Sequence, residues 1–210
     1  ASESSLGNRG FGSLRRIWLI LAAAGSIAAE NEPAPASAHA HVFVLHTVEV
    51  VFAGNAVAAL RLRWAFDEIF SDGMFKDFDT DGNQSFDAEE VNAIREVSLP
   101  SMKEFGYFTH VWVNGELKET FADVSLDVTS VGATVIYEWS LELAVPADPS
   151  REKVEISIFD DSYYVDVALR MPDAVKLLDA PAGCGYEIVE DEAKAFYYES
   201  IYPQVIGLSC

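Results

Sequence analysis

A stretch of twelve residues near the middle of the chain has the composition and spacing of a calcium-binding loop. Counted from Asp79 to Glu90, oxygen ligands fall at positions 1, 3, 5, 7, 9 and 12, the positions that an EF-hand loop uses. The predicted ligands are Asp79, Asp81, Asn83, Ser85, Asp87 and Glu90. Calcium is a hard cation that takes about six to eight oxygen ligands, so the predicted cofactor is calcium.

Position six of the loop departs from the pattern. Glycine is usual there because the backbone turns with a positive φ, whereas this chain has Gln84. The turn then costs roughly 1 kcal/mol or more, which predicts weaker calcium binding. The alternative is an acidic turn that caps a helix at Asp87 without binding an ion. No second loop of this spacing occurs in the sequence, and a single loop favours a structural use of calcium over a sensor.

A second candidate site rests on histidines near the start of the chain. If an export signal is removed after Ala38, His39 becomes the N-terminus, and its amine and ring lie next to His41 in sequence. Nitrogen donors of this kind suit nickel, copper or zinc. His110 completes this predicted transition-metal site if the fold brings it close. The alternatives are a polar chain end for the first two histidines and simple packing for His110.

The other histidine and the missing motifs argue against catalysis. His46 lies on the apolar face of a predicted strand and is expected to be a hydrogen-bonded core residue rather than a ligand. The sequence has no G-x-S-x-G, no H-E-x-x-H and no phosphate-binding glycine-rich loop, so we expect a protein that is not an enzyme. The 34 acidic residues outnumber the 14 lysines and arginines and give a formal charge of −20, which excludes nucleic acid as a partner.

The first 38 residues have the pattern of a secretion signal. Arg15 and Arg16 precede an apolar run over residues 17–29, and Ala36-Ser37-Ala38 resembles a cleavage site. The run is shorter than the about 20 residues of a membrane span, so no stable membrane insertion is expected after removal of residues 1–38. Cleavage after Ala28 and an uncleaved anchor are the alternatives. The predicted location is periplasmic or otherwise extracytoplasmic.

The two cysteines of the chain fit this export prediction. An even cysteine count in an exported protein favours a disulfide, here between Cys184 and Cys210. Two unpaired thiols are the alternative.

Residues 39–210 are expected to form one domain that is mainly β. Alternation of apolar and polar residues over short segments predicts an antiparallel β-sandwich, and Asn114-Gly115 predicts a hairpin turn. Helical spacing at about residues 67–105 predicts an inserted EF-hand-like helix–loop–helix, in which Pro100 kinks or ends the second helix. A final helix is expected over residues 191–199, followed by a closing strand over residues 205–208.

Several segments of the chain resemble one bacterial family. They are His39-Ala40-His41-Val42-Phe43-Val44, Trp64-Ala65-Phe66-Asp67-Glu68, Asp79-Thr80-Asp81-Gly82, Glu104-Phe105-Gly106-Tyr107-Phe108-Thr109-His110-Val111, Asp161-Ser162-Tyr163-Tyr164 and Ala180-Pro181-Ala182-Gly183-Cys184. The chain is similar over residues 39–210 to a domain of unknown function described as the periplasmic component of an uncharacterised ABC-type transport system. Family members usually begin His-Pro-His and more often have Asp-Gly where this chain has Asn83-Gln84.

The resemblance implies an extracytoplasmic location and a genomic neighbourhood with nickel, cobalt or zinc transporters. Together with the loop and the histidines, it leads us to expect an exported, non-catalytic metal-binding accessory protein whose partner is a membrane metal transporter. The alternative is a structural or interaction module in which calcium only stabilises the inserted hairpin.

Overall fold

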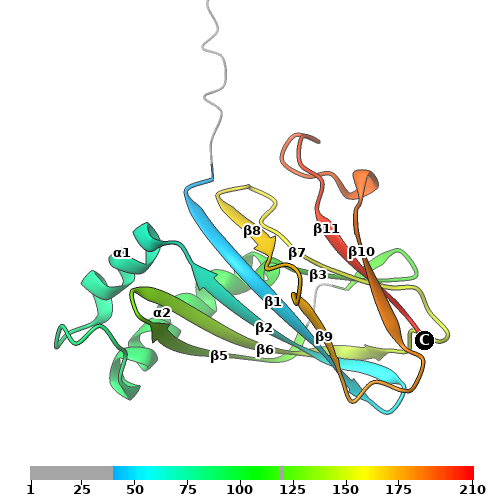
Figure 1. Ribbon diagram of the computed structural model, residues 1–210, viewed down its shortest axis with the longest axis horizontal. Coiled ribbons are helices and arrows are strands. Elements are labelled where there is room, and N and C mark those ends of the chain that lie inside the picture. The colour runs from blue at the N-terminus through cyan, green and yellow to red at the C-terminus, as the bar shows by residue number, and fades with distance from the viewer. Residues whose placement is uncertain (1–39, 119–120) are drawn as a thin grey trace, which may run out of the picture. The chain divides into compact units, whose positions relative to one another are not determined.

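Two β-sheets dominate the part of the chain that the structure describes, residues 40–118 and 121–210 of a computed structural model (Figure 1). The first sheet has the strand order β5-β6-β2-β1-β8, and β9 also pairs with β1. Its strands are β1 (Val42–Ala53), β2 (Ala56–Phe66), β5 (Phe121–Val131), β6 (Thr134–Ala147), β8 (Val165–Leu169) and β9 (Val175–Leu178). The predicted signal, residues 1–38, and His39 lie outside the described residues.

The second sheet has the order β10-β11-β7-β3-β4. Its strands are β3 (Thr109–Val113), β4 (Glu116–Lys118), β7 (Val154–Ile158), β10 (Gly185–Glu190) and β11 (Gln204–Ser209). All pairs in this sheet are antiparallel. The prediction of an antiparallel fold was wrong for β8 and β9, which run parallel to β1. Residue alternation specifies which face of a strand is buried, but it does not encode the direction from which a distant strand returns.

Alternating residues of the two sheets form one shared core. Residues 42, 44, 46, 48 and 50 of β1 are buried, and so are residues 60, 62, 64 and 66 of β2, as alternation predicts. His46 is among them, so its expected place in the core is confirmed, but its buried Nδ1 has no hydrogen-bond partner in the described part of the chain. Alternation places Val145 on the same face of β6 as Leu141 and Leu143, yet Val145 is exposed, because β6 leaves its regular pairing with β2 where the register shifts between Val57 and Ala59.

Two helices lie between β2 and β3 and sit at one end of the first sheet (Figure 1). They are α1 (Glu68–Phe78) and α2 (Ala88–Glu104), and α2 is followed by a short 3-10 turn, η1 (Gly106–Phe108). Pro100 does not end the second helix, because α2 continues to Glu104. A proline within a helix removes one backbone hydrogen bond, and the residues after Pro100 still complete a last turn. Neither α1 nor α2 combines the length and apolar character that crossing a bilayer requires.

The predicted final helix over residues 191–199 was wrong. Asp191 caps only a 3-10 turn, η2 (Glu192–Lys194), by accepting a hydrogen bond from the Ala193 N–H at 2.9 Å. Tyr197, Tyr198 and Glu199 then have positive φ angles of 45°, 58° and 57°, which a right-handed helix excludes. The closing strand is present as β11.

Two local predictions of chain geometry are confirmed. Asn114 and Gly115 have positive φ angles of 54° and 83°, as a tight β3–β4 hairpin requires. A disulfide joins Cys184 to Cys210 and so connects the start of β10 to the residue after β11.

Candidate metal centre

The loop between α1 and α2 is held at both ends by helix caps. Asp79 follows the last residue of α1, and its N–H donates to the Phe75 carbonyl at 3.0 Å. Asp87 caps α2, because its carboxylate accepts hydrogen bonds from the N–H groups of Glu89 and Glu90 at 2.8 and 2.9 Å. Glu90 Oε2 accepts in return from the Asp87 N–H at 3.0 Å, which completes a capping box. This reciprocal pair fixes the position of the Glu90 side chain.

The Asp79 carboxylate organises the backbone between the two caps. Its oxygens accept hydrogen bonds from the N–H groups of Gly82, Asn83 and Gln84 at 2.9, 3.1 and 2.8 Å. The loop therefore winds around this side chain. Gln84 has a φ of 62°, the left-handed conformation expected at position six.

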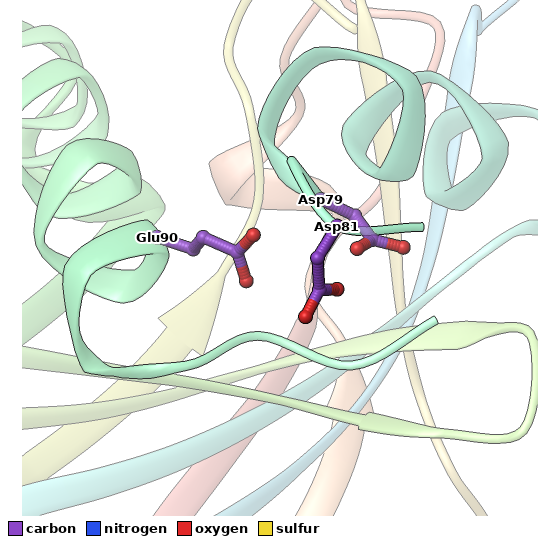
Figure 2. A group of neighbouring side chains, drawn as sticks. All are labelled: Asp79, Asp81 and Glu90. Atoms are coloured by element: carbon purple, nitrogen blue, oxygen red, sulfur yellow. The ribbon is translucent and has the colours of Figure 1, made fainter. Parts of the chain in front are cut away.

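Three of the six predicted ligands converge. One oxygen from each of Asp79, Asp81 and Glu90 lies within 4.8 Å of the others. Figure 2 shows the Glu90 carboxylate reaching from α2 toward the two aspartates of the loop. Oxygens on opposite sides of a calcium ion at 2.3–2.6 Å would be about 4.6–5.2 Å apart, so the spacing fits one shared cation.

The Glu90 side chain is buried, and its hydrogen bonds favour the ionised carboxylate. Glu90 is only 5% exposed. Hydrogen bonds lower its pKa, chiefly the one from the Asp87 backbone and then those from the hydroxyl and N–H of Thr80, at 2.8 and 2.6 Å from Oε1. Sequence reasoning missed Thr80 as a partner of Glu90. Its place between two loop aspartates was the available signal.

The other three predicted ligands make different contacts. Asn83 Oδ1 accepts from the Ser85 N–H at 2.7 Å, and Asn83 Nδ2 donates to Asp81 Oδ2 at 2.8 Å. Asp87 acts as the cap of α2. Within the described ranges, the converging group of acidic, histidine or cysteine side chains contains Asp79, Asp81 and Glu90 but not Asp87.

The predicted histidine site is spread around a different loop, which follows β7. His41 is exposed, its N–H donates to the Tyr164 carbonyl at 2.8 Å, and its ring lies 4.9 Å from the Tyr164 ring. His110 Nε2 lies 3.5 Å from Asp161 Oδ2. Of the predicted site, His41 and His110 are described, and both contact the segment 160–164. They are not part of any converging group of three such donors in the described residues.

His110 is fixed by aromatic packing beside this segment. Its ring is stacked on Phe159 at 3.9 Å and on Trp112 at 5.7 Å between ring centroids. The side chain also lines a cleft of about 440 Å³ together with Glu104 and Asp161. The expected packing beside Trp112 is thus present. The pairing with Asp161 was not foreseen, although the Asp160-Asp161 pair was visible in the sequence.

Asp67 connects two elements of the fold through its side chain. One carboxylate oxygen caps α1 by accepting from the Phe70 N–H at 2.9 Å. The other accepts from the Phe43 N–H at 2.7 Å and so connects the start of α1 to β1.

Comparison with known proteins gives a family and one distant relative. The family model described as "Protein of unknown function (DUF1007)" matches residues 27–202, and the chain belongs to this family. The chain is also 21% identical over 125 residues to an uncharacterised 15.5 kDa protein from the trpE 3′ region of Spirochaeta aurantia. That match covers 60% of this chain and 89% of the relative.

Proposed function

We propose that the protein is an exported, non-catalytic domain that binds calcium. In this proposal α1, the loop and α2 form an EF-hand-like helix–loop–helix inserted into a β-sandwich. The observation that carries the proposal is the convergence of three carboxylate oxygens, from Asp79, Asp81 and Glu90, within 4.8 Å. The disulfide supports an extracytoplasmic location, because such bonds persist in oxidising compartments.

Calcium would supply the positive charge that three converging carboxylates require. Asp79 would hold the loop backbone in place, Asp81 would approach from the loop, and Glu90 would approach from α2. The ion would thereby connect the end of α1 to the start of α2.

A further contact extends this effect to the first sheet. The Ser130 hydroxyl, near the end of β5, donates to the Gln84 carbonyl at 3.0 Å. This contact favours a structural brace, in which calcium stabilises the helical insertion against the β5–β6 hairpin.

Thermal unfolding with and without calcium tests the proposal. A ligand that binds only the folded state stabilises it by about 2.7 kcal/mol at one hundred times its dissociation constant, so Tm should rise with calcium. Glu90→Gln should abolish the rise, whereas Glu89→Gln, an exposed neighbour on α2, should retain it. An unchanged Tm of the wild type at millimolar calcium would contradict calcium binding.

A transport role is the second candidate. The resemblance to a transport-associated periplasmic family supports an accessory of a membrane metal transporter that handles nickel, cobalt or zinc. The contacts of His41 and His110 with one loop, and the pairing of His110 with Asp161, favour a nitrogen-and-oxygen site there. His39 would add its ring and, after cleavage, its terminal amine.

Metal titration separates the transport role from the brace. Protein that starts at His39 should bind nickel, copper or zinc when the calcium loop is saturated. His110→Ala and one additional residue before His39 should each weaken this binding. Equal binding by all three proteins would leave the calcium brace as the function.

A further inference from the structure

The outer face of the first sheet carries an ordered set of side chains. Because side chains alternate along strands, residues two apart on one strand share a face, and paired residues on adjacent strands form rows across it. The strand register gives three such rows on the face that points away from the core. The apolar row contains Ala168, Leu45, Ala65 and Ile136. The middle row contains Thr47, Arg63 and Glu138, and the last row contains Lys176, Glu49, Arg61 and Ser140.

The apolar row lies in a groove of about 540 Å³. Ile136 and the small residues Ala65 and Ala168 line it, and Ile136 is only 2% exposed. Phe43 and Leu45 line the groove too, and both are 52% exposed. Large exposed apolar side chains beside small ones leave room for an apolar group to insert.

Side chains of both charges lie next to this groove. Five acidic residues line it or the adjoining groove, namely Glu49, Asp67, Asp127, Glu138 and Asp166. Five of the 14 lysines and arginines of the chain line it or the adjoining groove. They are Arg61, Arg63, Arg95, Arg170 and Lys176. Arg61 and Arg170 have no ion-pair partner in the described part of the chain, although acidic residues outnumber basic ones more than twofold. Arg95 is paired with Asp127 at 2.7 Å, whereas Arg63 and Lys176 have only long contacts, of 3.7 and 3.6 Å, to Glu138 and Glu49.

We propose that this face binds an extended segment of a partner protein in which an apolar residue is followed at every second position by acidic residues. An extended segment rises about 3.3 Å per residue, so its alternate side chains are spaced like the rows of the sheet. A segment aligned with the strands would insert its apolar residue beside Leu45. Its first carboxylate would face Arg63 and Arg170, and its second would face Arg61.

The acidic side chains fix the direction of this segment. Asp166 pairs with Phe43 and lies at the opposite end of the groove from the arginines. Asp67 lies at that end as well. These carboxylates repel an acidic residue at that end of the groove. A segment whose acidic residues follow its apolar residue must therefore run from the Leu45 row toward the Arg61 row. A second copy of this chain is a less suitable occupant, because two molecules of charge −20 repel each other.

Peptide binding to the purified protein tests the inference independently of calcium. The probe is an end-blocked peptide, Ser-Leu-Thr-Glu-Thr-Glu-Thr, and the matched control has lysine for glutamate. The glutamate peptide should bind with an affinity that falls as salt rises, and the lysine peptide should not bind. Exposed ion pairs are weak, so Arg61→Gln and Arg170→Gln should each weaken binding about two- to fivefold. Arg151→Gln, an exposed arginine in the turn before β7, should leave binding unchanged.

Three results would overturn the inference. They are the absence of glutamate-peptide binding at millimolar concentration, equal binding of both peptides, and unaltered affinity in the Arg61→Gln/Arg170→Gln double variant. Ala65→Leu provides a second test, because the larger side chain fills the groove without removing charge and should block binding. Concentration-dependent dimerisation that Ala65→Leu abolishes would identify a second copy as the occupant instead.

Discussion

The loop after α1 and the loop after β7 both start with an aspartate that gathers three backbone N–H groups. Asp79 accepts from residues 82, 83 and 84, and Asp160 accepts from residues 162, 164 and 165. Each loop also contains a residue other than glycine in the left-handed conformation, Gln84 with φ 62° and Tyr163 with φ 53°. In both loops, one aspartate therefore accepts the backbone hydrogen bonds that hold the turn.

They differ in where the remaining carboxylates point. Asp160 is buried, and its neighbour Asp161 faces His110. In the loop after α1, Asp81 and Glu90 point toward Asp79. A cation is expected where carboxylates converge, whereas a single carboxylate surrounded by N–H donors is already satisfied. The comparison indicates that a metal site needs oxygens of several carboxylates in one space, which a single carboxylate surrounded by N–H donors does not provide.

The largest effect that sharpens this comparison is expected at Asp160. Asp160→Ala leaves the N–H groups of residues 162, 164 and 165 without their acceptor, and hydrogen bonds to charged groups are strong, so the loss should be about 3 kcal/mol of unfolding free energy. Asp161→Ala, which removes an exposed carboxylate, should change stability by less than about 0.5 kcal/mol. Urea unfolding of both variants measures the difference. Equal losses would mean that Asp160 does not hold its loop.

The left-handed turn at Gln84 in the loop after α1 gives the next largest effect. Gln84→Gly should raise the unfolding free energy by about 1 kcal/mol, because glycine adopts positive φ without strain. Gly82 also has a positive φ, of 72°, and no atom lies within 4 Å of an added Cβ. Gly82→Ala is therefore the converse substitution, and its unfolding free energy should fall by about 1 kcal/mol. Changes of the same sign in the two variants would show that conformational strain is not what they measure.

A smaller effect is expected where the loop meets β5. Ser130→Ala removes the hydrogen bond to the Gln84 carbonyl and should cost about 0.5–1 kcal/mol. Hydrogen exchange of the β5–β6 hairpin should then respond less to calcium. Ser125→Ala, at an exposed position on the same strand, is the control. An identical calcium response in wild type and Ser130→Ala would rule out the brace through this contact.

The pH dependence of the Glu90 contacts is expected to be the smallest of these effects. Hydrogen bonds lower the pKa of Glu90 in the folded state, so their stabilisation is complete above its ordinary value of about 4.3 and is lost as pH falls below it. The stability difference between wild type and Glu90→Gln should therefore shrink at low pH in urea titrations without calcium. A difference that persists unchanged to pH 3 would contradict this assignment.

Another residue adds a pH dependence that both proteins share. Burial lowers the pKa of His46 to about 3, so the unfolded state takes up a proton first as pH falls below about 6.5, and stability decreases. This decrease cancels when wild type and Glu90→Gln are compared.

Much of the fold was predictable because it depends on local patterns. The alternation in β1 and β2 specified the buried face, Asn114-Gly115 specified the β3–β4 hairpin, and the cysteines specified the disulfide. The parallel pairing of β8 and β9 with β1 was not predictable, because it depends on how distant segments return to the sheet. The turn at Tyr197 was missed because its left-handed residues carry no glycine signal.

The candidate sites show the same division. The spacing of Asp79, Asp81 and Glu90 predicted their convergence, because one short loop and one helix cap position all three. The pairing of His110 with Asp161 joins β3 to the loop after β7, and no local spacing encodes such a contact. The rows of charged residues on the outer face of the first sheet likewise require the strand register, which only the fold provides.

Calorimetric titration of calcium into the purified protein tests whether Asp79, Asp81 and Glu90 form a calcium site. We expect one calcium ion per chain, loss of this binding in Glu90→Gln and its retention in Glu89→Gln. Absence of binding heat in the wild type, or equal binding in all three proteins, would contradict a calcium site at Asp79, Asp81 and Glu90.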